Sequence, residues 1–229
     1  MKDYLNILRR AMQPNNQQII EYCIDQITNL QSDPAFVAIT GESGSGKSYF
    51  TKILQEELTK QGIEYSFLNH DAFLIPRKER ETLRNKRYTE GEFAGRSHWE
   101  VLENWYYLDA FQEVLNKLNN KHSAPYYPYM HATGEISKVP EIIEYKKVIL
   151  LENKLFFDQM DFVIELDVDR QKIIKRKIER DSDVRTPEQT IEMHEKAQGF
   201  YWDRQRPKNP DIIIDNNDFN NPKIVPNNE

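Results

Sequence analysis

A short run from Phe36 to Ser48 restricts the possible folds of this chain more than any other segment. It reads F-V-A-I-T-G-E-S-G-S-G-K-S: an apolar stretch, then G-x-x-x-x-G-K-S, then a segment with a helical pattern. This is the order of elements in a phosphate-binding loop, where backbone N–H groups surround a polyphosphate. The alternative, a glycine-rich turn followed by an accidental Lys-Ser, does not account for the strand before the loop or the helix after it.

Each residue type in the loop has a physical reason. Glycines allow positive φ angles and a close approach of the backbone to an anion. Lys47 is expected to reach the β- and γ-phosphates and Ser48 to offer its hydroxyl to Mg²⁺, while the positive end of the following helix faces the anion. The residues predicted to bind the nucleotide here are Gly41, Glu42, Ser43, Gly44, Ser45, Gly46, Lys47, Ser48 and Tyr49.

The length and charge of the chain narrow the class of ligand. With 229 residues, the chain suits one large domain or one core with a small insertion. A formal net charge of -6 argues against a nucleic-acid-binding surface and fits small anionic ligands in a local basic pocket. The one cysteine, Cys23, excludes an intramolecular disulfide and fits a reducing compartment. No apolar run approaches the roughly 20 residues of a membrane span, so we expect a cytoplasmic protein without a membrane partner.

Strand and helix patterns alternate along the chain, which predicts a parallel sheet covered on both faces. Strands are predicted at 36–40, 64–68, 147–152, 162–167 and 211–214. Helices are predicted within 4–31, with a break at 14–16, and at 47–61, 99–118, 170–180 and 187–202. The charged residues 75–97 are interpreted as a mobile excursion or a solvated loop, residues 124–131 as an extended aromatic segment, and residues 217–229 as a flexible tail.

Two carboxylates follow predicted strands at the edge where ligands bind in open α/β sheets. Asp71 comes after strand 64–68, and Glu152 ends strand 147–152. Phosphoryl transfer needs charge neutralisation and a base at the acceptor hydroxyl. We therefore predict Asp71 as the base, and Glu152 as a residue that holds a metal-bound water or assists Asp71, with Ser48 as the other metal ligand. The alternatives are a helix cap or turn residue for Asp71 and a polar strand end for Glu152.

Sequence motifs of other nucleotide-binding classes are absent. The runs Asn120-Lys121-His122-Ser123 and Asn153-Lys154-Leu155-Phe156 lack the final Asp of N-K-x-D, which recognises guanine. No Asp stands three residues before a glycine, so the D-x-x-G switch is missing, and there is no L-S-G-G-Q run. These absences disfavour a GTPase or a transporter ATPase.

The remaining motifs resemble, segment by segment, the uridine kinase and phosphoribulokinase group of phosphate-loop kinases. The resemblance spans roughly Phe36 to Ile214, and the order of the short motifs makes chance agreement improbable. The similar segments are Ser43–Ser48 with S-G-S-G-K-[ST], Asp71–Leu74 with D-S-F-Y, Pro125–Tyr129 with P-x-Y-D-[FY], Leu151–Phe157 with V-E-G-I-L-A-F, Phe162–Asp169 with a strand ending in V-D-x-D, and Arg176–Asp181 with R-R-x-x-R-D, where Lys177 takes the second position.

The chain departs from the pattern of this group at the lid and on the acceptor side. The lid motif E-R-G-R appears as Val184-Arg185-Thr186-Pro187, which keeps one arginine. Pro128 replaces the Asp of the tyrosine segment, and the interval to His131 is one residue shorter than in uridine kinases. Leu74 replaces the Tyr of D-S-F-Y. These changes weaken the link to uridine more than the link to the group.

The resemblance implies a nucleotide side and an acceptor side. The implied catalytic residues are Asp71, Lys47, Glu152 and Arg180; the other implied lid residues are Arg176 and Arg185; and the implied acceptor-binding residues are Asp71, Phe73, Arg77, Tyr127, Tyr129 and His131. A closing lid would bring the arginines to the transferring phosphate, although basic helix residues are also common on solvated faces. For the acceptor-side residues, ordinary surface or core packing is the alternative.

Together these observations predict an α/β protein of the P-loop NTPase type, with three αβα layers, a central mainly parallel sheet of about five strands and a helical lid. The predicted parts are a helical cap at 1–33, a kinase domain at 34–216 with an acceptor-side excursion at 75–135 and a lid at 181–203, and the tail. The predicted activity is ATP- and Mg²⁺-dependent phosphorylation of a small alcohol, uridine or cytidine first, with pantothenate, ribulose phosphate or another nucleoside-like alcohol as alternatives. A non-catalytic nucleotide-binding regulator is the competing hypothesis. The acceptor, ATP versus GTP as donor, and a homo-oligomeric state stay open.

Overall fold

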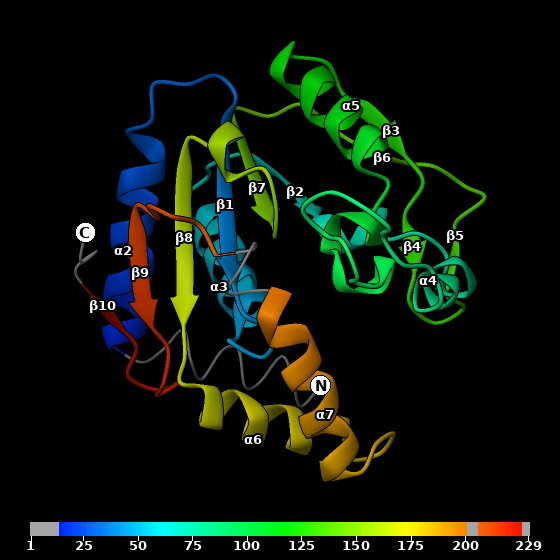
Figure 1. Cartoon of the computed structure of the whole chain (residues 1–229). Helices are drawn as coiled ribbons and strands as arrows, with labels where there is room; N and C mark the ends of the chain where they lie inside the picture. The colour runs from blue at the N-terminus through cyan, green and yellow to red at the C-terminus, as the bar shows by residue number, and fades with distance from the viewer. Residues whose placement is uncertain (1–13, 201–205, 226–229) are drawn as a thin grey trace. The chain divides into compact units, whose positions relative to one another are not determined.

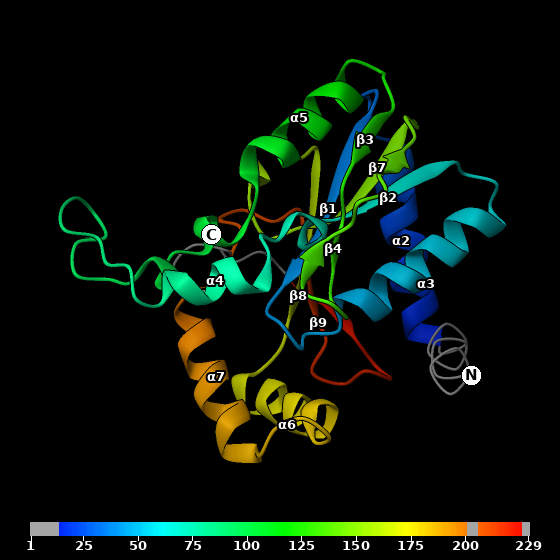
Figure 2. The same ribbon diagram turned by 90° about the vertical axis from the view of Figure 1, so that its right-hand side faces the viewer.

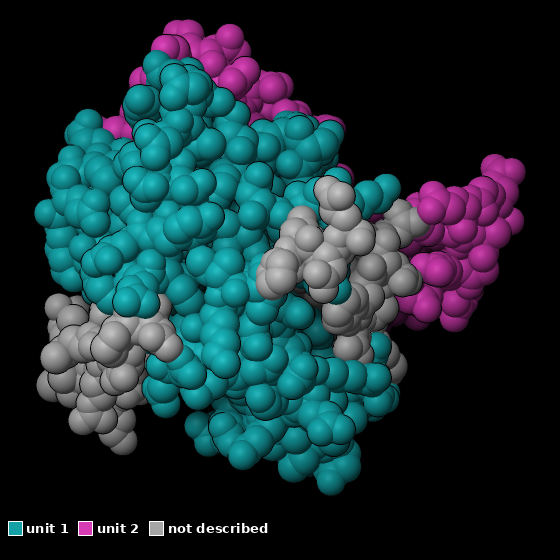
Figure 3. All heavy atoms as spheres, turned by 90° about the vertical axis from the view of Figure 1, so that its left-hand side faces the viewer, with its two compact units in different colours: residues 1–65, 147–229 teal, residues 66–146 magenta. Residues whose placement is uncertain are grey.

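The computed structural model describes residues 14–200 and 206–225, and the chain divides into two compact units (Figure 3). The first unit consists of residues 1–65 and 147–229, and the second of residues 66–146. Parts of three predicted segments lie outside the described residues: 4–13 of the N-terminal helices, 201–203 of the lid and 226–229 of the tail. Within the described residues, no helix has the length and apolar character needed to cross a membrane.

The first unit contains helices α2 (Pro14–Thr28), α3 (Lys47–Lys60), α6 (Arg170–Asp181) and α7 (Pro187–Phe200), strands β1 (Ala35–Gly41), β7 (Val148–Glu152), β8 (Phe162–Asp167), β9 (Ile212–Asp215) and β10 (Lys223–Val225), and the short 3₁₀ helix η4 (Phe157–Gln159) (Figure 1). The chain passes from the first unit into the second along β2 (Tyr65–Asn69). Six strands form one sheet in the order β10-β9-β8-β1-β7-β2.

The sheet is mainly parallel, as predicted. Strand β1 pairs in parallel with β7 and β8, and β8 pairs in parallel with β9. All five predicted strands are present. A sixth strand, β10, lies in the segment predicted as a flexible tail and pairs antiparallel with β9. The prediction was wrong here because a three-residue strand beside Pro222 has no alternation long enough to detect, and its pairing partner is supplied by the fold.

The core of the first unit lies on one face of the sheet, between the strands and helices α2 and α3. Side chains of Val37 and Ile39 point to this face and join apolar residues of both helices, including Cys23 and Leu54. Figure 2 shows the two helices on the same side of the strands. All seven residues of β1 are buried, so residues of the opposite face are covered as well, as expected for a parallel strand covered on both sides.

The second unit contains helices α4 (Arg77–Leu83) and α5 (Leu108–Asn119), the 3₁₀ helices η1 (His70–Phe73), η2 (His98–Glu100) and η3 (Leu102–Trp105), and the short strands β3 (Ala124–Tyr126), β4 (Tyr129–Met130), β5 (Glu135–Ile136) and β6 (Glu141–Ile143). The strands form two antiparallel pairs, β3 with β6 and β4 with β5. Helix α4 lies in the segment predicted as a mobile or solvated loop, and the extended aromatic segment is confirmed by β3 and β4.

The helix predicted at 99–118 starts nine residues late, at Leu108. Side chains hold the preceding residues in separate turns. The Asn104 amide donates to the carbonyl oxygen of His98 at 2.9 Å, and Nε1 of Trp105 donates to that of Trp99 at 2.9 Å. Such local bonds from side chains to the backbone compete with helical hydrogen bonds, and a periodicity argument does not detect them.

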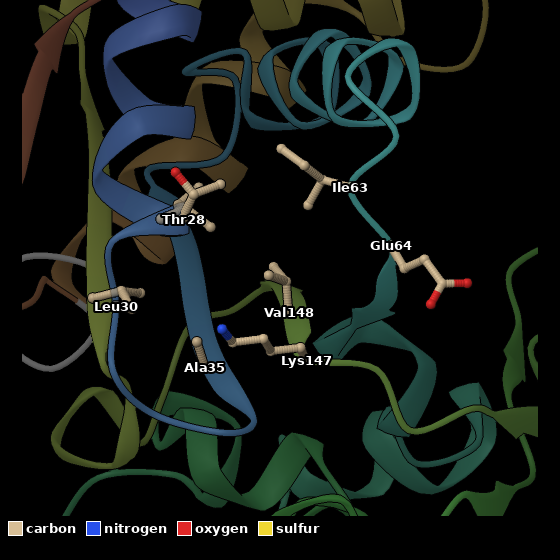
Figure 4. Close-up of a pocket in the computed structure, with 8 residues that line it drawn as sticks. Thr28, Leu30, Ala35, Ile63, Glu64, Lys147 and Val148 are labelled. Atoms are coloured by element: carbon tan, nitrogen blue, oxygen red, sulfur yellow. The ribbon is translucent and has the colours of Figure 1, made fainter.

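The first unit also has a hollow of about 260 Å³ at the amino ends of β1 and β7 (Figure 4). Ala35 and Val148 line it from the strands, and Ile27 and Ile63 from the chain around them. The phosphate loop follows the carboxyl end of β1, so this hollow lies at the opposite edge of the sheet and belongs to no predicted site.

Candidate functional site

The loop between β1 and α3 has the strand–loop–helix order predicted for a phosphate-binding loop. Steric contacts within the protein favour glycine at two positions of this loop, in addition to any contact with a ligand. Gly41 and Gly46 have φ angles of 140° and 99°. A Cβ atom at Gly41 would lie 2.5 Å from the carbonyl oxygen of Leu166, and one at Gly46 would lie 2.7 Å from Nδ2 of Asn216. The main chain is thus packed too tightly at both positions for a larger residue.

Lys47 is held against this loop. Its Nζ donates to the carbonyl oxygen of Gly41 at 2.7 Å and to that of Glu42 at 3.1 Å, and the residue is 6% exposed. The N–H of Ser45 donates to the Glu42 carbonyl at 2.9 Å and closes a turn. The fold therefore places a lysine ammonium at the loop, where the sequence motif requires it.

Ser48 and Glu152, the two predicted metal ligands, lie together. The Ser48 hydroxyl donates to Oε1 of Glu152 at 3.1 Å. Glu152 ends β7 and lies opposite Ile39 of β1. The next residue, Asn153, is buried, and its N–H donates to the Ile39 carbonyl at 3.1 Å, which fixes the backbone at Glu152. A hydroxyl and a carboxylate are ligands suited to Mg²⁺, which would take its other oxygens from phosphate and water. Among the described residues, no group of three or more His, Cys, Asp and Glu side chains is placed to hold a metal.

The three predicted lid arginines divide into two groups. Arg180 and Arg185 both bind Asp181, through Arg180 Nε to Oδ1 at 2.7 Å and Arg185 Nη1 to Oδ2 at 2.8 Å. The hydrogen bond from Arg180 is the main cause that lowers the pKa of Asp181. Asp181 therefore holds these two arginines together at the carboxyl end of α6, as members of one cluster.

Arg176 points to a different place, the segment that follows β9. Its Nη2 donates to the carbonyl oxygens of Asn216 at 2.8 Å and Asn217 at 3.1 Å, and its guanidinium lies 3.5 Å from the centroid of the Phe219 ring. Asn216 in turn donates to the carbonyl oxygen of Ser45 at 2.6 Å. Arg176 thus contributes to a support behind the phosphate loop, and a role toward the nucleotide stays a prediction.

A buried polar cluster at the loop was not predicted. His194 of α7 places Nδ1 2.9 Å from Nζ of Lys177 of α6 and 3.2 Å from Oε1 of Glu42. Burial raises the pKa of Glu42, lowers the pKa of Lys177 to about 8, and lowers the pKa of His194 to about 4. The place of Lys177 in R-R-x-x-R-D was a possible signal, whereas no pattern in the sequence indicated His194.

In the second unit, Asp71 lies in η1, directly after β2. Its N–H donates to Oδ1 of Asn69 at 2.8 Å, so Asn69 is the residue whose side chain caps the turn. The Asp71 carboxylate accepts a hydrogen bond from the hydroxyl of Tyr106 at 2.9 Å. Tyr106, which sequence reasoning missed, is buried and packs on the ring of His70 at 4.3 Å between centroids. A side chain that is oriented in this way can act as a proton acceptor.

Three predicted acceptor-side residues lie together in the second unit. Tyr129 and His131 meet edge to face at 5.0 Å between ring centroids. Nη2 of Arg77 donates to the carbonyl oxygen of His131 at 2.8 Å. Arg80, which was not predicted, donates to the Tyr129 hydroxyl and places its guanidinium 4.9 Å from the centre of that ring. This group combines aromatic faces with two cations.

The other two predicted acceptor-side residues do not join that group. Tyr127 is 55% exposed. Phe73 is 3% exposed and packs against the rings of Phe111 at 5.1 Å and Tyr126 at 5.6 Å. Packing in the core of the second unit therefore explains the position of the Phe73 side chain. Because this side chain is buried, the structure gives no support for its predicted contact with an acceptor.

Known proteins resemble this chain in sequence and in fold. A uridine kinase from Bacillus velezensis is 28% identical over 155 residues, which cover 65% of this chain and 67% of that protein. Two solved structures share the fold. D-glycerate 3-kinase from Cryptococcus neoformans var. grubii has a TM-score of 0.62 at 14% identity, and the match covers 92% of this chain and 99% of that one. A candidate fructose transport system kinase from Silicibacter sp. TM1040 has a TM-score of 0.61 at 19% identity, and the match covers 80% of this chain and 88% of that one.

The model of one protein family matches residues 36–196, from the start of β1 into α7. The match includes the phosphate loop, the end of β7 and the Asp181 cluster. This chain belongs to the phosphoribulokinase / uridine kinase family.

Proposed function

We propose that this protein is an ATP- and Mg²⁺-dependent kinase that transfers the γ-phosphate to a hydroxyl group of a small metabolite. The observation that carries the proposal is the pairing of Ser48 with Glu152 beside a loop that already holds the Lys47 ammonium. A hydroxyl and a carboxylate at this place suit a magnesium–nucleotide complex, which a kinase needs as its phosphoryl donor. Membership of the family supports the same reaction.

The proposed roles follow from what each side chain can do. Loop N–H groups and Lys47 bind the β- and γ-phosphates and neutralise charge that develops during transfer. Ser48 and Glu152 would hold Mg²⁺, which would supply positive charge to the phosphate groups when bound. Asp71, oriented by Tyr106, accepts the proton of the acceptor hydroxyl. The Arg180 and Arg185 cluster supplies further positive charge.

The acceptor is proposed from chemistry and from relatives. The relatives with significant sequence similarity are uridine kinases, which favours uridine or cytidine. The group formed by Arg77, Arg80, Tyr129 and His131 offers cations for an anion and the exposed ring of His131 for a base, whereas Tyr129 is 5% exposed. Because proteins that share the fold include a D-glycerate 3-kinase, sugars and hydroxy acids belong in the acceptor panel as well.

An acceptor panel with Mg-ATP tests the proposal. ADP formation is measured with uridine, cytidine, pantothenate, ribulose 5-phosphate, fructose and D-glycerate, and without an acceptor. We expect one acceptor to raise ADP formation well above the basal rate. Asp71→Asn should lower the acceptor-dependent rate about 10²- to 10⁴-fold, the usual contribution of a general base, while Mg-ATP binding is retained. Glu152→Gln should weaken Mg-ATP binding more than binding of ATP in EDTA.

Matched controls separate these effects from general damage. Asp109→Asn makes the same change at an exposed position in the second unit, and Lys52→Met is an exposed control for Lys47→Met in the same helix. Both controls should leave turnover within about twofold of the wild type. Mg-ATP binding without acceptor-dependent turnover on the whole panel would contradict the kinase proposal and favour a nucleotide-binding regulator.

A further inference from the structure

Glu42 places a buried carboxylate in the phosphate loop. It is the second residue of a loop that is built to bind a polyanion, yet it adds a carboxylate that is 6% exposed. A negative charge so close to bound phosphates opposes their binding. The surroundings of Glu42 show how the fold accommodates this charge.

Cations from several elements act on this carboxylate. Lys177, Lys47 and Arg170 favour the charged form of Glu42, whereas Asp167 at the end of β8 disfavours it. His194 faces two of these cations, Lys177 and Arg170 of α6. The positive charges of Lys177, Lys47 and Arg170 therefore partly offset the negative charge of the carboxylate.

Lys177 lies on the loop itself. A Cβ atom built on Gly44 would be 3.4 Å from Cγ and 3.5 Å from Cε of Lys177, so the lysine stem covers the bend of the loop. The residue is 7% exposed, and its ammonium ends 2.9 Å from Nδ1 of His194. Lys177 is thus a second lysine held at the loop, and its ammonium is directed toward His194.

His194 cannot satisfy both of its neighbours at once. Its side chain is fully buried, and one nitrogen, Nδ1, lies within reach of the Lys177 ammonium and the Glu42 carboxylate. A neutral imidazole nitrogen either accepts a hydrogen bond or donates one. Nε2 is buried and has no hydrogen-bond partner among the described residues. The ring is therefore suited to two arrangements: Nδ1 accepts from Lys177, or Nδ1–H donates to Glu42.

We propose that Glu42 is an internal anion that occupies Lys177 through His194 until the phosphates of a nucleotide displace it. This inference rests on the proposed nucleotide site and adds Glu42 and His194 to it as residues that tune affinity and position Lys177. On binding, the Lys177 ammonium moves its hydrogen bond from Nδ1 to a phosphate oxygen. The imidazole then changes tautomer, losing the proton at Nε2 and gaining one at Nδ1, and Nδ1–H donates to Glu42. Bound phosphates also place negative charge near Glu42, which favours its protonated form, and the proton that Glu42 then takes up comes from the buffer.

The distinguishing prediction is a gain in affinity. Glu42→Gln keeps the size of the side chain and removes its charge, so Mg-ADP should bind more tightly. One like charge at about 8 Å, at an effective dielectric constant near 40, corresponds to roughly a fivefold change in Kd. A purely structural role for Glu42 predicts the opposite sign, because the substitution would then disturb the loop.

Two substitutions at His194 test the positioning role. His194→Leu leaves no Nδ1–H to donate to Glu42 once Lys177 has moved to a phosphate, so it should weaken Mg-ADP binding several-fold. His194→Asn keeps a polar group near the position of Nδ1 and should bind within about twofold of the wild type. His122→Leu is the matched control, because it makes the same substitution at an exposed position of the second unit, outside this cluster. It should leave Kd unchanged.

Isothermal titration calorimetry of the full-length protein with Mg-ADP decides between the outcomes, with thermal melts to confirm folding. At pH 6.5 the Lys177 ammonium is already protonated, so titration in buffers of different ionisation enthalpy reports proton uptake by Glu42. On binding Mg-ADP, the wild type should take up more protons than Glu42→Gln. If that variant does not fold, the wild type alone is measured, and its proton uptake must exceed the uptake that Mg-ADP itself accounts for. An affinity that is unchanged or lower in folded Glu42→Gln overturns this inference and leaves the proposed function intact. Absence of Mg-ADP binding by the wild type removes both.

Discussion

Replacing Gly46 with alanine tests how tightly the phosphate loop is held by the segment after β9. A Cβ atom at this position would lie 2.7 Å from Nδ2 of Asn216 and 2.9 Å from Cε1 of Phe219. Nδ2 of Asn216 donates to the carbonyl oxygen of Ser45 at 2.6 Å, and Asn216 is 2% exposed. The added methyl group must therefore displace a buried amide from its acceptor.

The expected loss of stability has two parts. Gly46 has a φ of 99°, and holding an alanine in such a conformation costs about 1–2 kcal/mol. Loss of the buried hydrogen bond, with its carbonyl acceptor left unsatisfied, adds about 1–3 kcal/mol. The sum is about 2–5 kcal/mol. Gly62 provides the control: it has a φ of 69°, and a Cβ atom there would have no neighbour within 4 Å, so only the backbone cost applies.

Urea unfolding followed by far-UV circular dichroism measures both variants. Gly46→Ala should lose at least about 1 kcal/mol more free energy of unfolding than Gly62→Ala, which reflects the displaced hydrogen bond. Equal losses of unfolding free energy in the two variants would show that displacing the Asn216 side chain does not destabilise the protein. The proposed support of the loop by the segment after β9 would then be refuted.

Three further predictions concern other buried groups. Burial raises the pKa of the Cys23 thiol to about 12, so the native protein should resist Ellman's reagent at pH 8 and react only in denaturant; fast native reaction would contradict the packing of α2. Tyr106→Phe removes the hydrogen bond to Asp71, and acceptor-dependent turnover should fall about tenfold while Mg-ATP binding is unchanged; equal turnover would exclude a role for this bond. The pKa of His194 is lowered to about 4 in the folded protein, whereas that of histidine in the unfolded chain is near 6.5. Between these two pH values the unfolded chain binds more protons than the folded protein, so acidification through this window should destabilise the fold. This contribution should be missing in His194→Asn, and equal slopes of unfolding free energy against pH would disprove it.

Local patterns sufficed for the parts of the fold that depend on neighbours in sequence. The apolar run before Gly41 predicts a buried strand, and the spacing of the loop motif predicts the turn into α3. The end of the run at Glu152 also placed a carboxylate at the correct edge, because parallel strands that leave a sheet in one direction end on the same side. The proximity of Glu152 to Ser48 follows from this register, and the structure confirms it.

Hydrogen bonds from side chains and pairing between strands, in contrast, decided the elements that periodicity described wrongly. The turns before α5 form because Asn104 and Trp105 bond to the backbone, and β10 forms because β9 offers it a pairing edge. The period of apolar residues indicates neither cause.

What the amino-acid sequence determined by itself is the chemistry of the phosphate loop and the order of strands and helices, because both depend on residues that are close together in the chain. Only the tertiary structure decided that Arg176 turns to the segment after β9 and that His194 lies between Lys177 and Glu42. These partners come from separate elements, and the direction of each side chain depends on how its helix is rotated against the sheet. Helix rotation is set by packing of the whole first unit, and no short stretch of sequence specifies it.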